Sequence, residues 1–204
     1  PVGAIGRAGG RPGIGPFVQD GVLNPAGLVL DKQGKLWVAE ANQTPPRISV
    51  WQARAVGDGK EGGFIKEFFG PTHYGASGGA INPRDPNVMA GEGCEWRIDP
   101  KTGRDVCLGT FENHFAGVAL YAEGSNGKLY LVTCSRDTGL SIRERLGDAK
   151  FALRGSIVVA DPAEKKTVFW ADANGDEQQQ PDELATHPAA LTMFGYLGWS
   201  LNMN

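Results

Sequence analysis

The feature that most constrains the fold of this 204-residue chain is a repeated pattern of short apolar strands. Segment 24–40 contains two apolar stretches around a polar turn, and the pattern returns in 115–120 followed by 127–132. A weaker copy covers 79–91. Short apolar runs separated by tight turns pair as antiparallel hairpins, so each copy predicts one hairpin.

A second hairpin is predicted after each copy, and the three join 47–51 to 64–69, 96–99 to 106–108, and 157–161 to 167–170. Four antiparallel strands per repeat, at a spacing of roughly 40 to 60 residues, match one blade of a β-propeller. Thirty glycines and thirteen prolines supply the turns. The sequence therefore predicts an all-β, partial β-propeller domain over 1–204, with blades at about 20–70, 76–112 and 115–171 and the start of another at 190–204.

The first repeat, with Pro25–Asp31, Gly34–Glu40 and Arg47–Trp51, resembles an NHL-type blade, and the resemblance extends more loosely over 20–171. The chain is also similar to large secreted NHL-like propeller proteins of environmental bacteria. Such families commonly close a ring of six blades. About three blades would leave strand edges and apolar faces exposed, so the remaining blades of the same protein are one expected partner.

Between Asp172 and Glu183, oxygen-bearing side chains occupy loop positions 1, 3, 5, 7, 9 and 12, namely Asp172, Asn174, Asp176, Gln178, Gln180 and Glu183. Ca²⁺ takes six to eight oxygen ligands, and this alternation is typical of calcium loops. The run resembles the EF-hand-like loops of dockerins and other secreted repeat proteins, although Glu177 stands at position 6, where Gly is usual. A solvated acidic turn is the alternative.

Cysteine positions bear on the cellular compartment. If Ile98 pairs with Gly103 in the predicted hairpin, Cys94 lies opposite Cys107, close enough for a disulfide. That bond would indicate an oxidising environment, so we expect a secreted, periplasmic or cell-surface protein. Two reduced cysteines on one sheet face are the alternative. Cys134 follows an apolar strand and is expected to be buried.

Composition and motifs narrow the function. A net charge of −3 argues against nucleic acid as a partner, and no apolar run approaches membrane-spanning length. No nucleophile elbow, phosphate-binding loop or zinc-protease motif is present. Ile142, Leu146 and Ala149 fall at helical spacing, which predicts a short helix within 135–154.

Residues just beyond strand ends, or on links between blades, form a candidate ligand face: Glu40, Asn42, His73, Tyr74, Glu92, Glu112 and Asn113. The leading hypothesis is a secreted propeller module that binds a protein or polysaccharide partner and carries a structural Ca²⁺. Propeller lactonases hold a divalent metal with similar carboxylates and amides, so a metal-dependent hydrolase or lyase is an alternative. A third hypothesis is that the chain is a structural repeat of a surface or matrix protein.

Overall fold

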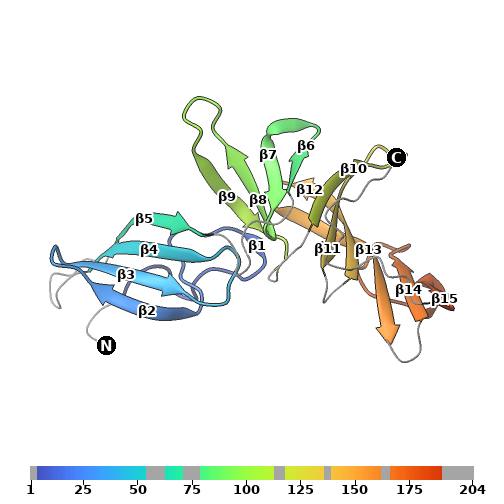
Figure 1. The fold of residues 1–204 in the computed structure, drawn as a ribbon, viewed down its shortest axis with the longest axis horizontal. Helices are drawn as coiled ribbons and strands as arrows, with labels where there is room; N and C mark the ends of the chain where they lie inside the picture. The colour runs from blue at the N-terminus through green and yellow to red at the C-terminus, as the bar shows by residue number, and fades with distance from the viewer. Residues whose placement is uncertain are drawn as a thin grey trace.

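The computed structural model describes residues 4–53, 63–70, 79–112, 118–135, 139–161 and 166–189. Its regular structure consists of strands in three antiparallel sheets and one short 3-10 helix, η1 (Pro181–Glu183). Apart from β1, which joins the middle sheet, the sheets follow one another along the chain and stand as separate layers (Figure 1). The all-β architecture of successive antiparallel sheets predicted from the repeats is confirmed. Within the described residues there is no helix with the length and apolarity that a membrane crossing needs.

The first sheet has the strand order β2-β3-β4-β5. Its strands are β2 (Pro25–Leu30), β3 (Lys35–Glu40), β4 (Arg47–Gln52) and β5 (Phe64–Phe69). The β2–β3 turn is closed by Asp31, whose Oδ1 accepts hydrogen bonds from the backbone N–H groups of Gln33 and Lys35, each at 2.9 Å. Gly34 completes the turn with a φ of +74°, which favours glycine.

The middle sheet has the order β1-β9-β8-β7-β6, so the N-terminal segment contributes an edge strand. Its strands are β1 (Gly15–Pro16), β6 (Ala80–Asn82), β7 (Asp85–Gly91), β8 (Cys94–Ile98) and β9 (Asp105–Thr110). The tight β7–β8 turn uses Glu92 and Gly93, both with positive φ. A Cβ at Gly93 would lie 2.4 Å from the carbonyl oxygen of Glu112, so only glycine fits there.

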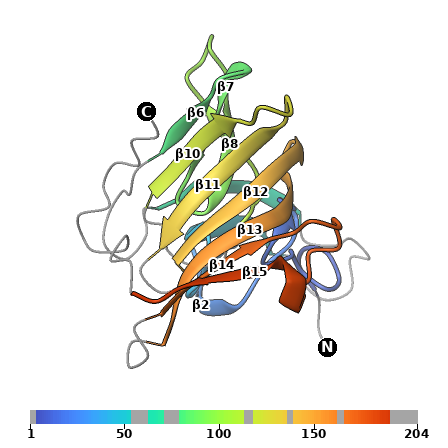
Figure 2. The same cartoon turned by 90° about the vertical axis from the view of Figure 1, so that its right-hand side faces the viewer.

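The third sheet is a six-stranded meander in sequence order, visible in Figure 2. Its strands are β10 (Val118–Glu123), β11 (Leu129–Ser135), β12 (Gly139–Gly147), β13 (Lys150–Asp161), β14 (Lys166–Ala171) and β15 (Leu184–His187). All six predicted hairpins form, as β2–β3, β4–β5, β6–β7, β8–β9, β10–β11 and β13–β14. The prediction of four strands per repeat holds for the first sheet, whereas the middle sheet has five strands and the third has six. The predicted start of another blade at 190–204 lies outside the described residues.

The helix predicted within 135–154 is wrong, because 139–147 is strand β12, paired with both β11 and β13. Ile142 and Leu146 are four residues apart, a spacing that fits one face of a strand as well as one face of a helix. The β12–β13 hairpin turns at Ala149, which has a φ of +52°. Pairing with the neighbouring strands β11 and β13 therefore decides between the two structures.

The predicted disulfide between Cys94 and Cys107 is not present, since both are free buried thiols, as is Cys134. The predicted register is also wrong, because Cys94 pairs with Thr110 and Cys107 with Trp96. The turn after β8 is longer than expected, and the backbone N–H of Asp99 donates to the carbonyl of Arg104. A hydrogen bond with Cys94, together with burial, raises the pKa of the Cys107 thiol.

The free thiols lead to a first prediction. A thiol reagent that reacts with thiolates should label the native chain slowly near pH 8, because buried, neutral thiols are poor nucleophiles. In denaturant, protein purified without reductant should yield three reactive thiols, one for each cysteine. A single reactive thiol per chain would contradict the structure and support the predicted disulfide.

Apolar alternation in the sequence predicts that Leu28, Leu36, Val38, Ile48 and Val50 all point inward from the first sheet, and this prediction is partly wrong. Ile48 pairs with Ala39 and Val50 with Trp37, so these two residues lie on the face opposite Val38. Val38 and Val50 are buried, at 1% and 0% exposure, whereas Leu28 and Ile48 are 64% and 44% exposed. Leu28 and Leu36 share the face of Val38, since cross-strand partners project to the same side.

A compact core joins the middle and third sheets. Its buried members are Ala90, Phe111, Ala119, Tyr121, Leu129 and Leu131. Fully buried Glu95 of β8 lies at the same interface, where it accepts hydrogen bonds from the Tyr121 hydroxyl at 2.7 Å and from Arg145 Nε at 2.6 Å. It also accepts one from the backbone N–H of Ala149 at 2.6 Å. One carboxylate thus connects the middle sheet to β10 and to the β12–β13 hairpin.

We predict that Glu95→Ala lowers the free energy of unfolding by about 3 kcal/mol, because it leaves Arg145 without its buried carboxylate partner. The urea midpoint of the full chain measures this change. Glu123→Ala is the matched control, since Glu123 forms an exposed ion pair with Arg84 that is worth at most about 1 kcal/mol. Equal effects of the two substitutions would contradict a structural role for Glu95.

Candidate functional site

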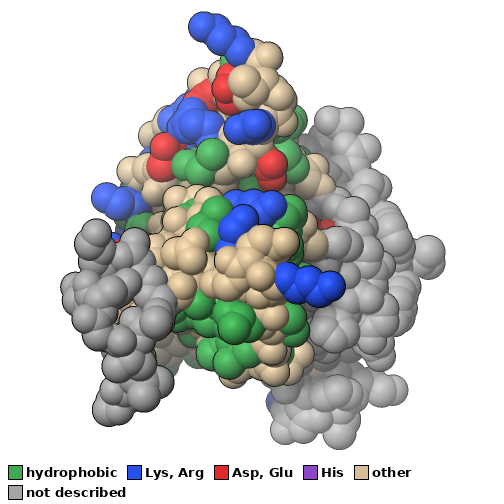
Figure 3. Space-filling view, turned by 90° about the vertical axis from the view of Figure 1, so that its left-hand side faces the viewer, with side chains coloured by type: hydrophobic (Ala, Val, Ile, Leu, Met, Phe, Trp, Pro, Cys, Tyr) green, Lys and Arg blue, Asp and Glu red, His purple; other side chains and the backbone are tan. Residues whose placement is uncertain are grey.

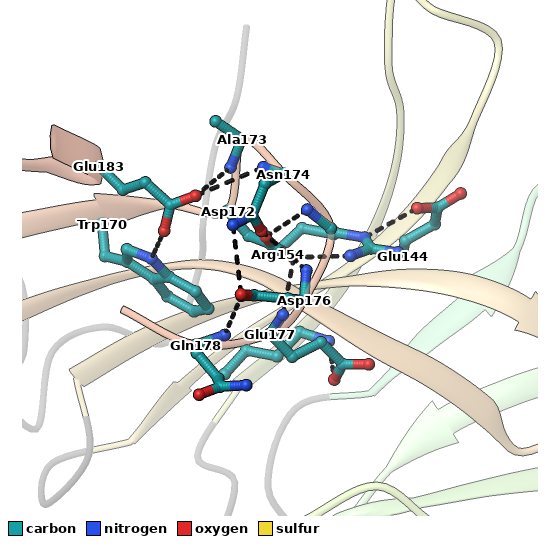
Figure 4. Close-up of polar contacts among 12 residues, drawn as sticks. Glu144, Arg154, Trp170, Asp172, Ala173, Asn174, Asp176, Glu177, Gln178 and Glu183 are labelled. Atoms are coloured by element: carbon teal, nitrogen blue, oxygen red, sulfur yellow. Dashed lines mark hydrogen bonds and ion pairs between the residues drawn. The ribbon is translucent and has the colours of Figure 1, made fainter. Parts of the chain in front are cut away.

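The oxygen-rich loop 172–183 connects β14 to β15 at one edge of the third sheet (Figure 4). Glu183 joins its two ends, because Oε1 accepts the backbone N–H of Ala173 at 2.8 Å and Oε2 accepts the indole N–H of Trp170 at 2.9 Å. A strand leads into the loop, as the β-branched and aromatic residues before it predict. The loop therefore differs from an EF-hand in its flanks.

Carboxylates at the start and middle of the loop hold its turns. Asp172 accepts Arg154 Nη1 at 2.6 Å and the backbone N–H of Gly175 at 2.7 Å. Asp176 accepts the backbone N–H of Gln178 at 2.8 Å and Gln180 Nε2 at 2.7 Å. N–H donors thus orient the carboxylate oxygens of Asp172 and Asp176. In calcium loops, carboxylates are held in the same way, and their remaining lone pairs face the cation.

Glu177, at loop position 6, adopts a left-handed backbone with a φ of +62°. Calcium loops place glycine here because a side chain disfavours this conformation. The Glu177 carboxylate accepts the backbone N–H of Leu153 at 3.0 Å, and this contact with β13 helps to hold the residue in place. The loop therefore has the expected sharp turn despite the residue that departs from the motif.

The donor set fits a hard cation in part. Gln180 Oε1, at position 9, is buried and has no hydrogen-bond partner among the described residues. Among those same residues, however, no group of three or more His, Cys, Asp or Glu side chains is arranged to hold a metal. A cation here would need amide and backbone oxygens as well as carboxylates. The side chain of Gln178 points away from Asp172 and Glu183 (Figure 4).

Local contacts shift the pKa values of the surrounding groups. Burial raises the pKa of Asp172, but hydrogen bonds from Arg154 and from the loop backbone outweigh it and the net pKa is lowered. The indole of Trp170 is the main cause of the lowered pKa of Glu183. A hydrogen bond from Lys128 is the main cause of the lowered pKa of Glu144, and contact with Asp172 raises the pKa of Arg154.

A cavity of about 390 Å³ adjoins the loop on the third sheet. Its lining comes from the β10–β11 turn, β11, β12, β13 and the start of the loop: Asn126, Lys128, Tyr130, Ile142, Glu144, Arg154 and Asp172 to Gly175. Sequence reasoning missed this group. Lys128 and Tyr130 lie in the recognised repeat, but Glu144 and Arg154 fall in the segment 135–154, for which a helix is predicted.

The candidate ligand face is only partly described, because His73, Tyr74 and Asn113 lie outside the described residues. Glu40 is buried and both of its oxygens are bound, by Arg47 Nη1 at 3.0 Å and Arg11 Nε at 2.8 Å. The ion pair between Arg11 and Glu40 connects the N-terminal segment to the first sheet. Asn42 is exposed and has a φ of +53°.

Two other members of that face lie in or next to strand connections. Glu92 occupies the β7–β8 turn with a φ of +56°. Glu112 is buried after β9 and accepts a hydrogen bond from the Thr133 hydroxyl at 3.1 Å. Arg143 donates to the same hydroxyl at 2.8 Å. The structure therefore gives Glu40 partners on β4 and in the N-terminal segment, and Glu112 a partner on β11.

Comparison with solved structures gives distant similarities. A protein from Lactobacillus plantarum matches with a TM-score of 0.32 and 18% identity, over 79% of this chain and 52% of that one. The PQQ domain of pyranose dehydrogenase from Coprinopsis cinerea, in its holo form, matches with a TM-score of 0.25 and 13% identity, over 76% and 45%. This chain spans about half of each. No protein-family model and no curated protein matches it.

The lowered carboxyl pKa values predict acid sensitivity of the loop. Because Asp172 and Glu183 have lower pKa values when folded, their stabilisation is complete above the unfolded values of about 4 and is lost as pH falls through the folded ones. The melting temperature in EDTA should therefore fall between about pH 5 and pH 2. Asp172→Asn should flatten this dependence, whereas Asp182→Asn, in the same loop, should not.

Proposed function

We propose that this chain is an exported, NHL-type β-propeller binding module whose third sheet is stabilised by Ca²⁺ in loop 172–183. The observation that carries the calcium proposal is the buried, unpartnered Oε1 of Gln180 at loop position 9. A buried acceptor without a donor is costly, and a cation would satisfy it. The left-handed backbone at position 6 is a second feature of such loops.

Asp172, Asn174, Asp176 and Glu183 would supply side-chain oxygens, Gln180 its Oε1, and Gln178 its backbone carbonyl. The ion would offset the charge of three carboxylates and clamp the end of β14 to the start of β15. It would thereby stabilise the edge of the sheet. Since extracellular calcium modules bind with Kd values of about 0.1 to 1 mM, the site suits a secreted, periplasmic or cell-surface protein.

Arg154 would tune the affinity of this site. Its guanidinium already neutralises part of the charge of Asp172, at 2.6 Å. Calcium affinity depends on the net negative charge of the ligand set, so a nearby cation lowers it. Loss of this charge should therefore strengthen calcium binding, a response opposite to that expected for a ligand.

The binding-module part of the proposal is supported by exposed apolar side chains on the side of the molecule that the first sheet occupies (Figure 3). Val29 is 64% and Phe68 46% exposed, and the Trp37 ring stacks on Phe68 with centroids 5.8 Å apart. Exposed apolar patches are typical of interaction sites. A protein, a polysaccharide or the remaining blades of the same protein could cover this one.

Titration calorimetry and thermal melting of the full chain test the calcium proposal. We expect Ca²⁺ to bind with a Kd below about 1 mM and to raise the melting temperature. Asp172→Ala/Asp176→Ala should abolish both effects, Arg154→Gln should tighten binding, and Asp182→Ala is the control within the loop. Absence of binding at millimolar Ca²⁺, or unchanged binding by the double variant, would refute the site.

A further inference from the structure

We propose that the cavity beside loop 172–183 binds a neutral saccharide. This inference deepens the proposed function, since it rests on the chain being a binding module and names the site and the class of ligand. The cavity, at about 390 Å³, is within the size range of small-molecule sites. It combines apolar side chains with convergent donors and acceptors, the composition that orients a ligand.

The charged groups of the cavity are already paired with one another. Lys128 contacts Glu144 at 3.0 Å, Glu144 contacts Arg154 Nε at 3.0 Å, and Arg154 Nη1 contacts Asp172 at 2.6 Å. These four paired side chains carry two positive and two negative charges. The cavity therefore offers an ionic ligand no net charge to neutralise. An anion or a cation would have to break an existing pair, which is costly for partly buried groups.

Hydroxyl groups match this lining. A sugar hydroxyl both donates and accepts, so it can donate to a carboxylate lone pair and accept from a neighbouring ammonium or amide N–H. Hydrogen bonds to charged groups are the stronger ones. The Tyr130 hydroxyl accepts Asn126 Nδ2 at 2.9 Å and keeps its own proton to donate. Its ring and Ile142 supply the apolar surface on which the C–H face of a sugar ring can pack.

Comparison of the internal repeats indicates that the polar side chains lining the cavity are not needed for a sheet of this kind to form. Lys128 and Tyr130 correspond to Lys35 and Trp37 of the first repeat. In the third sheet Tyr130 pairs with Glu144 of the adjacent strand, whereas in the first sheet Trp37 pairs with Val50, which is fully buried. The same sheet position thus carries a charged group in one repeat and an apolar core residue in the other.

NMR titration of the ¹⁵N-labelled full chain in EDTA tests the proposal, because the charge balance of the cavity is that of the calcium-free chain, in which Arg154 contacts Asp172. The probes are the tetrasaccharides of cellulose, xylan, mannan and starch, with tetragalacturonate as the anionic comparison, each to about 10 mM, above a weak millimolar Kd. We expect at least one neutral probe to shift the backbone amides of Asn126, Lys128 and Tyr130. Lys128→Ala and Glu144→Gln should each weaken that binding about tenfold or more.

Lys35→Ala is the matched control, because it removes the corresponding lysine of the first repeat, and it should leave the affinity unchanged. Calcium binding, measured on the same variants, shows whether the loop is intact. The cavity proposal is overturned if no neutral probe shifts these amides, if the shifts map only to the first sheet, or if tetragalacturonate binds more tightly. Normal calcium binding beside such a result would leave the calcium proposal standing, and its absence would refute that proposal separately.

Discussion

The buried Glu95 carboxylate organises the contact between the middle and third sheets. It lies on β8, and its partners come from β10, from β12 and from the turn that follows β12. A fully buried charge is tolerated only when it is paired and hydrogen-bonded, so this contact specifies which residues of the two sheets face each other. The apolar core around Leu131 then packs on the same interface.

That orientation turns the opposite face of β11 and β12 away from the core. Tyr130 alternates with Leu129 and Leu131, and it therefore projects with Glu144 to the side where the cavity forms. Arg154 of β13 links this cavity to the loop through Asp172. The cavity and the loop are thus two parts of one charged surface on the third sheet, and calcium in the loop would alter the charge that Arg154 experiences.

Prediction from sequence succeeded where the signal was local. Alternating apolar residues and turn residues such as Asp31 and Gly34 define hairpins within a few tens of residues, and those hairpins were predicted correctly. It failed where two local patterns were equivalent. The spacing of Ile142 and Leu146 suits a helix or a strand. The register around Cys94 depends on the length of the β8–β9 turn, which the turn residues Asp99 and Pro100 do not specify.

The sequence by itself determined the all-β class, the hairpins and the alternating oxygens of loop 172–183, because strand alternation, turn chemistry and side-chain spacing are properties of neighbouring residues. The tertiary structure alone decided that 139–147 is a strand, that Cys94 lies opposite Thr110, and that Lys128, Glu144, Arg154 and Asp172 form one chain of charges. These residues are distant in the sequence. The pairing of β11, β12, β13 and β14 brings them together, and burial of the core on the opposite face selects that pairing.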